Sequence, residues 1–219
     1  ASSQLRRAIM ATNAEFWDRV ARKYAAHRIS DQAGYDRTID RLRGLLGPED
    51  QVLELGCGTG STALLLAGGT GSYLAADFSA AMITLAEEKL AASPVAQLGF
   101  RVAVAEDLVR DEPRYDAVLG FNYLHLVGDL PRTLTAIREL LVPGGLFVSK
   151  TPCLGDMNPL IRLAIPVMQF IGKAPHVNVF SAEALREAVE SAGFAIDAVE
   201  YHGTKRKDAR SVIIARRPA

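Results

Sequence analysis

Residues 52–60 read VLELGCGTG, a short apolar run that leads into three glycines at alternate positions. The run QVLEL over residues 51–55 predicts a buried strand, and the residues after the glycines predict a helix over residues 61–67. Glycines let the main chain approach a ligand without a Cβ in the way, and a helix N-terminus offers unpaired N–H groups to an anion. The stretch therefore predicts a strand, a turn and a helix that together bind a small molecule.

The alternation of strand and helix continues along the chain. Further strands are predicted over residues 72–76, 100–104, 115–120 and 146–150. Further helices are predicted over residues 13–27, 36–46, 80–92 and 130–141, and a last one runs from the cap Ser181 to residue 192. Strands separated by helices at this spacing build a doubly wound, parallel sheet. Two late runs, residues 195–201 and 211–215, form a hairpin-like pair. We therefore expect an α/β fold with a seven-stranded, mostly parallel sheet and one antiparallel edge strand.

The composition is typical of a folded domain with a full core. The chain has 219 residues, of which 49% are hydrophobic, and its 25 basic residues balance its 25 acidic ones. We expect a single domain over residues 1–219, with N-terminal helices over residues 13–46 and an insertion over residues 152–180. The lack of a basic excess disfavours nucleic acid as a partner. Two distant cysteines, Cys57 and Cys153, and the lack of an apolar stretch of about 18 residues favour a cytoplasmic protein without a transmembrane segment.

The spacing of the glycines separates two kinds of nucleotide-binding loop. The dinucleotide fingerprint needs GxGxxG, but Ser61 stands at the third glycine position, so this loop is GxGxG. An acidic residue that holds ribose hydroxyls is expected at the end of the second strand, about 20 residues further on. Asp77 stands there. The loop and Asp77 together predict a nucleoside site at the carboxyl edge of the sheet.

The loop VLELGCGTG, Asp77 in AADFS and the turn PGG at residues 143–145 resemble the class I S-adenosylmethionine-dependent methyltransferases, over about residues 16–216. The resemblance implies a Rossmann-like methyltransferase fold and S-adenosylmethionine as the cofactor. It also implies a set of cofactor-binding residues in and around the loop. Gly56, Gly58 and Gly60 line the methionine moiety, Cys57 belongs to the same loop, and Glu54 orients it. Asp77 holds both ribose hydroxyls, and Phe78 lies against the adenine face.

The same resemblance places an acidic residue beside the exocyclic amine of adenine. Glu106 and Asp107, just past the third strand, are both candidates, and the register of that segment does not decide between them. For every assignment a structural alternative stays open: the glycines could serve the turn alone, and the acidic residues could be solvated. Cys57 is expected to be a small buried residue rather than a nucleophile, because no basic neighbour in the sequence would lower its pKa.

Residues 122–125, NYLH, follow the fourth strand and should face the same edge of the sheet. Asn122 offers an amide near the donor methyl, and His125 offers an imidazole that could take a proton from the acceptor at neutral pH. The alternative for His125 is a purely structural histidine. On the first helix, Tyr24 could reach the donor, as in related enzymes, or could pack in the core. Neither cysteine lies at metal-ligand spacing from a histidine, so no metal is expected.

The insertion contains NPLIRLAIPVMQFIG at residues 158–172, in which Arg162 is the one charge. It is too short to span a bilayer, and Pro166 predicts a kinked helix or two short helical turns. Three interpretations stay open: a lid over an apolar acceptor, a surface that touches a membrane or a partner subunit, and core cover. Beyond it, His176 and Asn178 could add polar contacts or could be solvated.

These features predict a methyltransferase that acts on a small, apolar or aromatic acceptor, and a resemblance to methyltransferases of quinone biosynthesis points the same way. Two other functions stay open. One is a donor-binding module of the same fold without transfer activity. The other is a nicotinamide-dependent dehydrogenase, against which Ser61 argues. The acceptor atom and the oligomeric state are not predicted.

Overall fold

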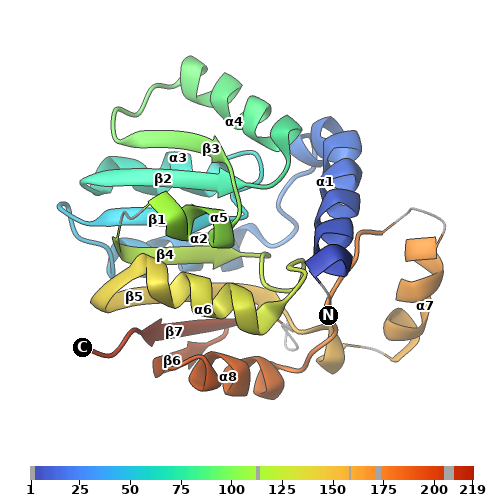
Figure 1. The fold of residues 1–219 in the computed structure, drawn as a ribbon. Helices are drawn as coiled ribbons and strands as arrows, with labels where there is room; N and C mark the ends of the chain where they lie inside the picture. The colour runs from blue at the N-terminus through green and yellow to red at the C-terminus, as the bar shows by residue number, and fades with distance from the viewer. Residues whose placement is uncertain (1–2, 112–113, 158, 171–173, 205–209) are drawn as a thin grey trace.

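The computed structural model describes residues 3–219 apart from residues 112–113, 158, 171–173 and 205–209. The described residues form one seven-stranded sheet in the order β3-β2-β1-β4-β5-β7-β6 (Figure 1). The strands are β1 (Gln51–Leu55), β2 (Ser72–Asp77), β3 (Leu98–Val102), β4 (Tyr115–Phe121), β5 (Leu141–Pro152), β6 (Ala195–Glu200) and β7 (Arg210–Arg216). Neighbouring strands are parallel, except that β7 runs antiparallel to both β5 and β6. The predicted fold class is confirmed, and the antiparallel strand lies one place in from the edge.

Helices cover both faces of this sheet. The described helices are α1 (Ser3–Ala25), α2 (Gln32–Arg43), α3 (Ser61–Leu66), α4 (Ala80–Ala92), α5 (Ala105–Leu108), α6 (Leu130–Leu140), α7 (Pro159–Phe170) and α8 (Ala182–Ser191). One apolar cluster packs α5, α6 and α8 against the sheet, and a second packs α2, α3 and α4 against its other face. The molecule is therefore a three-layer α/β structure.

Strand residues alternate between the two clusters because successive side chains of a strand point to opposite faces. Val118 of β4 and Phe147 of β5 belong to the first cluster, whereas the next residues, Leu119 and Val148, belong to the second. All four are almost fully buried. A sheet that is covered on both faces can bind a ligand only at its ends, and the glycine loop lies at the carboxyl end of β1.

Side-chain caps fix where several helices begin. Ser79 accepts a hydrogen bond from the Met82 N–H at the start of α4, and Asp129 does the same for Arg132 at the start of α6. Ser181 accepts from the Ala184 N–H, which confirms the predicted cap of α8. Each cap satisfies one backbone donor that the first turn of a helix leaves unpaired.

Several predicted boundaries were wrong. The strand expected over residues 100–104 is β3, Leu98–Val102, because the short helix α5 begins at Ala105 and takes the end of the apolar run. The helix expected from residue 13 begins at Ser3. The helix expected to end at residue 46 ends at Arg43, where the Gly44 N–H bonds to carbonyls of the last turn.

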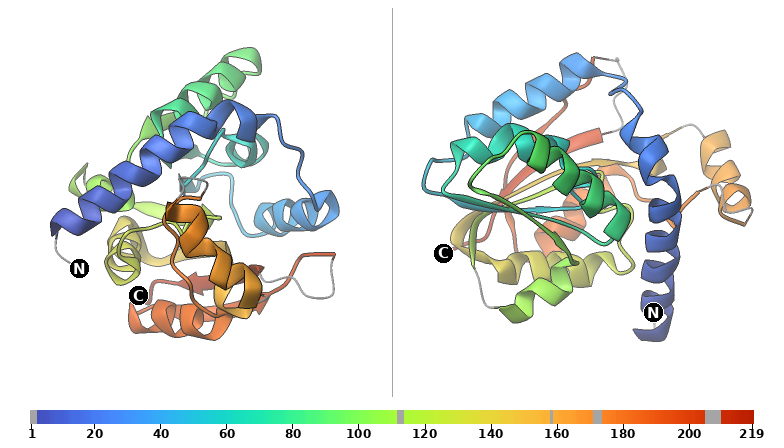
Figure 2. Two further views of the ribbon diagram at one scale, coloured as in Figure 1. Left: turned by 90° about the vertical axis from the view of Figure 1, so that its right-hand side faces the viewer. Right: turned by 90° about the horizontal axis from the view of Figure 1, so that it is seen from above.

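The first helix lies across the carboxyl edge of the sheet. Figure 1 shows α1 at the end toward which the parallel strands point, and the left view of Figure 2, which looks onto that edge, shows α1 crossing in front of it. The helix packs against α4. Helix α7 lies on the same side of the molecule, beyond α1 (Figure 1). Helix α1 therefore lies beside the edge at which a doubly wound sheet binds its ligands.

Candidate functional site

Two cavities lie at the carboxyl edge and share part of their walls. One, of ≈ 310 Å³, is lined by Asp77 at the end of β2, by Phe78 and by Met82 in the first turn of α4, and we name it the α4 cavity. The other, of ≈ 270 Å³, is lined by residues of α2 such as Thr38 and Leu42, and we name it the α2 cavity. The residues common to both walls are Tyr24, Gly56, Gly58, Phe121 and Asn122. Molecules bound in the two cavities would therefore meet at the glycine loop and at the end of β4.

The glycine loop has a backbone that only glycine adopts readily. Gly56, Gly58 and Gly60 have φ values of 69°, 54° and 73°. A Cβ at Gly56 would lie 2.7 Å from Tyr123 Cδ2, whereas a Cβ at Gly58 would meet nothing closer than Tyr24 Cε1 at 3.9 Å. Gly58 thus borders open space on the cavity side. Tyr123 therefore packs closely against the loop at Gly56, whereas the loop is open to the cavity at Gly58.

Asp77 ties this loop to the start of α4. Its Oδ2 accepts a hydrogen bond from the Gly58 N–H at 2.9 Å, and its Oδ1 accepts one from the Ser79 N–H at 2.9 Å. The side chain is 7% exposed, and burial raises its pKa while both N–H contacts lower it. An ionised carboxylate has about four acceptor sites, so Asp77 can accept from a ligand hydroxyl in addition to these backbone contacts. This arrangement fits the predicted ribose contact.

The α4 cavity fits a nucleoside. Asp77 supplies acceptors, and Phe78, Met82 and Trp17 supply apolar surface. Two buried polar atoms on this wall, Trp17 Nε1 and His125 Nδ1, make no hydrogen bond to the described protein. Buried polar atoms without a partner are rare in folded proteins and point to a missing ligand or water. The residues present thus fit a group with an apolar ring and polar substituents.

Glu54 lies beneath the loop as a buried carboxyl group. It is 2% exposed, and its Oε2 accepts a hydrogen bond from the Tyr73 hydroxyl at 2.8 Å. Burial raises the pKa of Glu54 to about 8, with the charge of Asp77 acting in the same direction. Glu54 also lines the α2 cavity. At neutral pH this carboxyl group is largely protonated.

Cys57 fits its predicted role as a small buried residue of the loop. It is 8% exposed, and burial raises the pKa of its thiol. A thiol with a raised pKa is a poor nucleophile at neutral pH. Cys57 also lines the α2 cavity.

The chain turns sharply where β4 ends. Asn122 has φ 51°, the one positive value outside glycine among the described residues, and asparagine tolerates this region better than most side chains. Its N–H donates to the Lys150 carbonyl at 2.7 Å. Tyr123 is buried under Gly56, and burial raises its pKa. The turn brings Asn122 to the shared wall of the two cavities.

His125 lines the α4 cavity beside Leu126. Burial lowers the pKa of His125 to about 4, so the imidazole is neutral at physiological pH. Its backbone carbonyl accepts a hydrogen bond from the Asn178 N–H at 2.7 Å, and the Asn178 side chain donates to the Val127 carbonyl at 2.6 Å. The segment after α7 is therefore joined to the segment after β4. Asn178 has a structural contact here that the sequence did not reveal.

Two side chains of α1 fasten this helix over the α4 cavity. Asn13 is fully buried and donates to the Leu126 carbonyl at 3.0 Å and to the His176 carbonyl at 3.2 Å, while its Oδ1 accepts from the His176 N–H at 2.8 Å. Asp18 accepts from the Ser79 hydroxyl at 2.6 Å and from the Ala81 N–H at 3.1 Å. Neither was singled out from the sequence, because both look like ordinary polar residues of an amphipathic helix.

Tyr24 stands at the wall that the two cavities share. Its ring meets Trp17 edge to face, with 5.4 Å between centroids, and burial raises the pKa of its hydroxyl. Tyr24 thus lines both cavities and packs on a neighbouring ring, and its contact with the donor stays a prediction.

Glu106 and Asp107 lie elsewhere. The Glu106 carboxylate accepts a hydrogen bond from the Thr133 hydroxyl at 2.6 Å, and Asp107 is exposed on α5. Neither belongs to the residues that line the two cavities. Their contact with adenine stays a prediction from the resemblance.

The apolar insertion forms α7, with Pro166 inside the helix. Leu160, Val167 and Met168 are 72%, 62% and 42% exposed. No described residue of α7 lines either cavity, so the lid stays a prediction, and part of the insertion, residues 158 and 171–173, lies outside the described residues. Within the described part of the chain, no helix is long and apolar enough to cross a membrane, and no group of His, Cys, Asp and Glu is placed to hold a metal.

A family model and curated relatives show which family the chain resembles. A family model described as a methyltransferase domain matches residues 23–199. The demethylmenaquinone methyltransferase of Symbiobacterium thermophilum is 30% identical over 155 residues, which cover 68% of this chain and 60% of that protein. The 2-phytyl-1,4-naphtoquinone methyltransferase of Trichormus variabilis is 35% identical over 100 residues, 44% of each chain. The chain thus spans about 60% or less of the length of these relatives.

Solved structures show the same fold at low identity. Magnesium protoporphyrin IX methyltransferase from Synechocystis, solved with bound S-adenosylmethionine, superposes with a TM-score of 0.67 at 18% identity and covers 99% of this chain and 98% of that one. A cyclase superposes with a TM-score of 0.69 at 19% identity and covers 94% of this chain and 95% of that one. Structures at this identity support the fold only.

Proposed function

Because the chain belongs to the class I S-adenosylmethionine-dependent methyltransferases, we propose that it transfers the methyl group of S-adenosylmethionine to a small, apolar or aromatic acceptor. The observation that carries this proposal is the pair of cavities that share Gly56, Gly58 and Asn122. A transfer between two bound molecules needs their reacting atoms in line and close together. One cavity fits the donor, and the other leaves room for the acceptor at the common wall.

The α4 cavity is proposed to hold the nucleoside half of the donor. Asp77 binds the ribose hydroxyls, Phe78 lies against adenine, and the open side of Gly58 admits the methionine half. When bound, the sulfonium supplies a methyl group that is open to displacement. The protein's own contribution is chiefly alignment, which removes an orientational barrier of roughly 7 to 11 kcal/mol in favourable cases.

The α2 cavity is proposed to hold the acceptor. Its wall combines apolar side chains, among them Ile39, Leu42 and Phe121, with a polar floor. This composition supports an acceptor with an apolar or aromatic body. Two of the relatives are named for quinone substrates, which supports the same class.

His125 is proposed as the base that takes the acceptor's proton. Its neutral imidazole has an unpaired Nδ1. His125 lines the α4 cavity and not the α2 cavity, so this role requires the reacting atom of the acceptor to lie at the wall that the two cavities share, beside Asn122. A neutral imidazole can accept a proton, but a pKa of about 4 makes it a weaker base than a free histidine at neutral pH. Where the acceptor loses no proton, His125 only shapes the cavity.

A second candidate is a module that holds the donor without transferring its methyl group. A cyclase has the same fold as this chain, and one fold supports unrelated chemistries. The fold by itself therefore does not require methyl transfer. Labelled S-adenosylmethionine incubated with the protein and a cell extract separates the two. A labelled small-molecule product supports transfer, whereas donor binding without any labelled product supports the module.

The exposed side chains of α7 suit a contact with an apolar partner. Leu160 and Val167 are exposed on α7, a helix that lies at the carboxyl edge of the sheet beyond α1 (Figure 1). We propose that this helix meets the apolar acceptor on entry or touches a membrane surface. Co-sedimentation with phosphatidylcholine vesicles, compared between the wild type and Val167→Ser, tests the membrane contact, which is rejected if neither protein sediments.

A further inference from the structure

Helix α1 contributes nothing to the core of the described structure. Helices α2, α3 and α4 supply residues to one apolar cluster and α5, α6 and α8 supply residues to the other, but neither cluster contains a residue of α1. Within the described part of the chain, α4 is the one helix or strand against which α1 packs extensively. Undocking of α1 would therefore leave the core intact.

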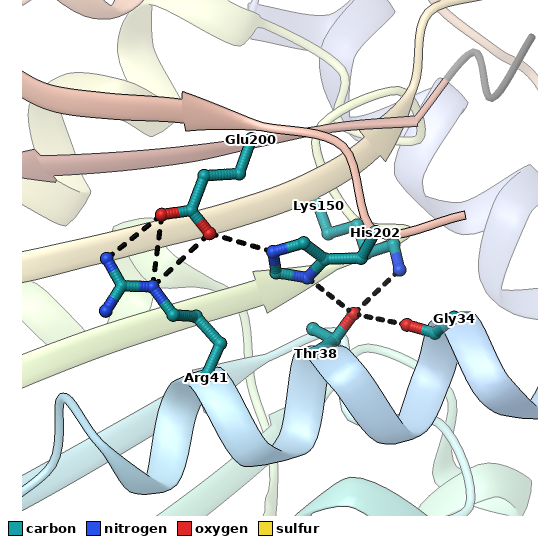
Figure 3. A network of polar contacts seen from close by, with 6 residues as sticks. All are labelled: Gly34, Thr38, Arg41, Lys150, Glu200 and His202. Carbon is teal, nitrogen blue, oxygen red and sulfur yellow. Dashed lines mark hydrogen bonds and ion pairs between the residues drawn. The ribbon is translucent and has the colours of Figure 1, made fainter. Parts of the chain in front are cut away.

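The next helix along the chain, α2, is fixed in two ways. Its Ile39 and Leu42 belong to an apolar cluster. Its polar side also bonds to the sheet region, because Thr38 Oγ1 lies 3.0 Å from His202 Nδ1 and accepts from Lys150 Nζ at 2.8 Å (Figure 3). Helix α2 is thus held by the core and by side chains of β5 and of the segment after β6, whereas α1 has no share in either cluster.

Two polar side chains attach α1 beside the α4 cavity. Asn13 donates to the carbonyl of Leu126 at 3.0 Å, and Leu126 lines this cavity. Asp18 accepts from the Ser79 hydroxyl at 2.6 Å and from the Ala81 N–H at 3.1 Å, at the start of α4. The left view of Figure 2 shows α1 crossing in front of this edge of the sheet. Both attachments thus involve the segments that surround the proposed donor site.

Ser79 connects Asp18 of α1 to Asp77, the carboxylate proposed to bind the ribose. Ser79 is fully buried, and its N–H donates to Asp77 Oδ1 at 2.9 Å. Its hydroxyl accepts from the Met82 N–H at 3.1 Å and donates its one proton to Asp18. A ligand that fixes Asp77 therefore also fixes the residue on which α1 is docked.

The docked position of α1 leaves one polar atom unpaired. Trp17, one residue before Asp18, lines the α4 cavity, and its Nε1 is buried without a hydrogen bond to the described protein. A buried N–H without a partner costs free energy. Docking of α1 in the free protein is therefore less favourable than its other contacts alone would make it, and contacts with a ligand in the cavity would offset this cost.

We propose that the donor docks α1: a nucleoside bound in the α4 cavity holds α1 in the described position, with Asp18 as the positioning residue that acts through Ser79 and Asp77. The coupling is reciprocal, so a docked α1 also strengthens donor binding. The proposal rests on the α4 cavity being the donor site and adds the coupling to it. Tyr24 and Ala25 at the end of α1 line the α2 cavity, so the bound donor also completes a wall of the proposed acceptor site.

The variant test measures the affinity for S-adenosylhomocysteine by calorimetry on the full chain. Asp18→Ala removes the contacts with Ser79 and Ala81 and should weaken binding about tenfold, because the ligand must then dock a helix that has lost one attachment. Asp18→Asn keeps an oxygen that accepts from both groups and should recover most of the affinity. Glu15→Ala removes an exposed carboxylate from the same helix and should bind as the wild type does.

Trp17 is the only tryptophan of the chain, so its fluorescence reports on α1 directly. Without ligand, the emission of Asp18→Ala should lie at longer wavelength than that of the wild type, and saturation with S-adenosylhomocysteine should restore the wild-type value. Wild-type affinity in Asp18→Ala, or an equal loss of affinity in Glu15→Ala, overturns the inference.

A measurement without variants gives an independent answer. Hydrogen exchange followed by mass spectrometry should slow about tenfold in α1 when the wild type is saturated with S-adenosylhomocysteine, with saturation established by calorimetry. Exchange in α8, of which no described residue lines either cavity, should stay the same. Bound S-adenosylhomocysteine with unchanged exchange in α1 overturns the inference and leaves the proposed function standing. No binding of S-adenosylhomocysteine to the wild type would remove the proposed donor site itself.

Discussion

The backbone N–H of Gly58 donates to Asp77 Oδ2 at 2.9 Å, so the carboxylate assigned to the ribose also holds the glycine loop in place. The other oxygen accepts from the Ser79 N–H at the start of α4. One side chain at the end of β2 therefore fixes two backbone segments that border the α4 cavity. Loss of its charge should affect binding and local structure together.

Asp77→Asn should weaken the binding of S-adenosylhomocysteine by about 10- to 100-fold, because an amide cannot accept from both N–H groups and from the ribose. Calorimetry measures the affinity, and circular dichroism checks the fold. Asp40→Asn, which removes an exposed carboxylate on α2, is the matched control and should bind normally. Unchanged affinity in Asp77→Asn contradicts the assignment.

Gly58→Ala separates backbone strain from ligand contact. The residue has φ 54° and open space around its missing Cβ, so alanine should cost about 1 kcal/mol of stability, from the left-handed backbone alone. Gly144, with φ 78° and open space, lies far from the site and should lose a similar amount. Only Gly58→Ala should also lose affinity for S-adenosylhomocysteine. Urea unfolding and calorimetry give the two quantities, and equal ligand affinity in both variants would argue against Gly58 as a contact.

The sequence was sufficient for the existence of the strands and of the loop, because both depend on local patterns, but it placed the antiparallel strand at the edge of the sheet, where β6 lies. Alternating strands and helices, the GxGxG spacing and Asp77 are visible within short windows, and the structure brings the loop and Asp77 into direct contact. The predicted end of a strand was wrong where an apolar run continues from a strand into a helix, as between Val102 and Ala105.

The polar contacts that close the site could not be predicted, because they join distant parts of the chain. Asn13 bonds to His176, and Thr38 bonds to both Lys150 and His202. No pattern within a helix or strand marks such pairs. The sequence contains one weak indication of these contacts, because Lys150 is a charged residue in the mostly apolar run LFVSK of β5.

His125→Gln should lower kcat by about 100-fold or more if the imidazole takes a proton, with little change in donor affinity. Burial lowers the pKa of His125 to about 4, so its base form is present throughout neutral pH. The wild-type rate should therefore show no loss of this base between about pH 6 and 8, and an acidic limb nearer pH 4 than 6.5. Unchanged turnover in the variant would leave His125 with a structural role only.

Asn13→Ala should loosen α1 over the α4 cavity. The fully buried amide makes three hydrogen bonds to the segments after β4 and after α7, and its loss leaves their backbone groups unpaired. We expect a loss of roughly 2 to 3 kcal/mol in stability and weaker donor binding. Hydrogen exchange should speed up in α1 and around Leu126 but not in β1. Gln32→Ala, at an exposed position, is the control and should change neither.

Glu54→Gln should make the protein less sensitive to alkaline pH. Burial raises the pKa of Glu54 from 4.5 to about 8, so between these values the folded state keeps a proton that the unfolded chain has lost. The folded state binds more protons there, and the free energy of unfolding therefore falls as pH rises from about 4.5 to about 8, by up to about 1.4 kcal/mol per pH unit. Glutamine keeps the shape and an acceptor for the Tyr73 hydroxyl but has no proton to lose. In urea unfolding, the free energy of unfolding of the variant minus that of the wild type should therefore increase from pH 5 to 7 and again from pH 7 to 9. A difference that does not change with pH would show that Glu54 is ionised in the folded protein at neutral pH.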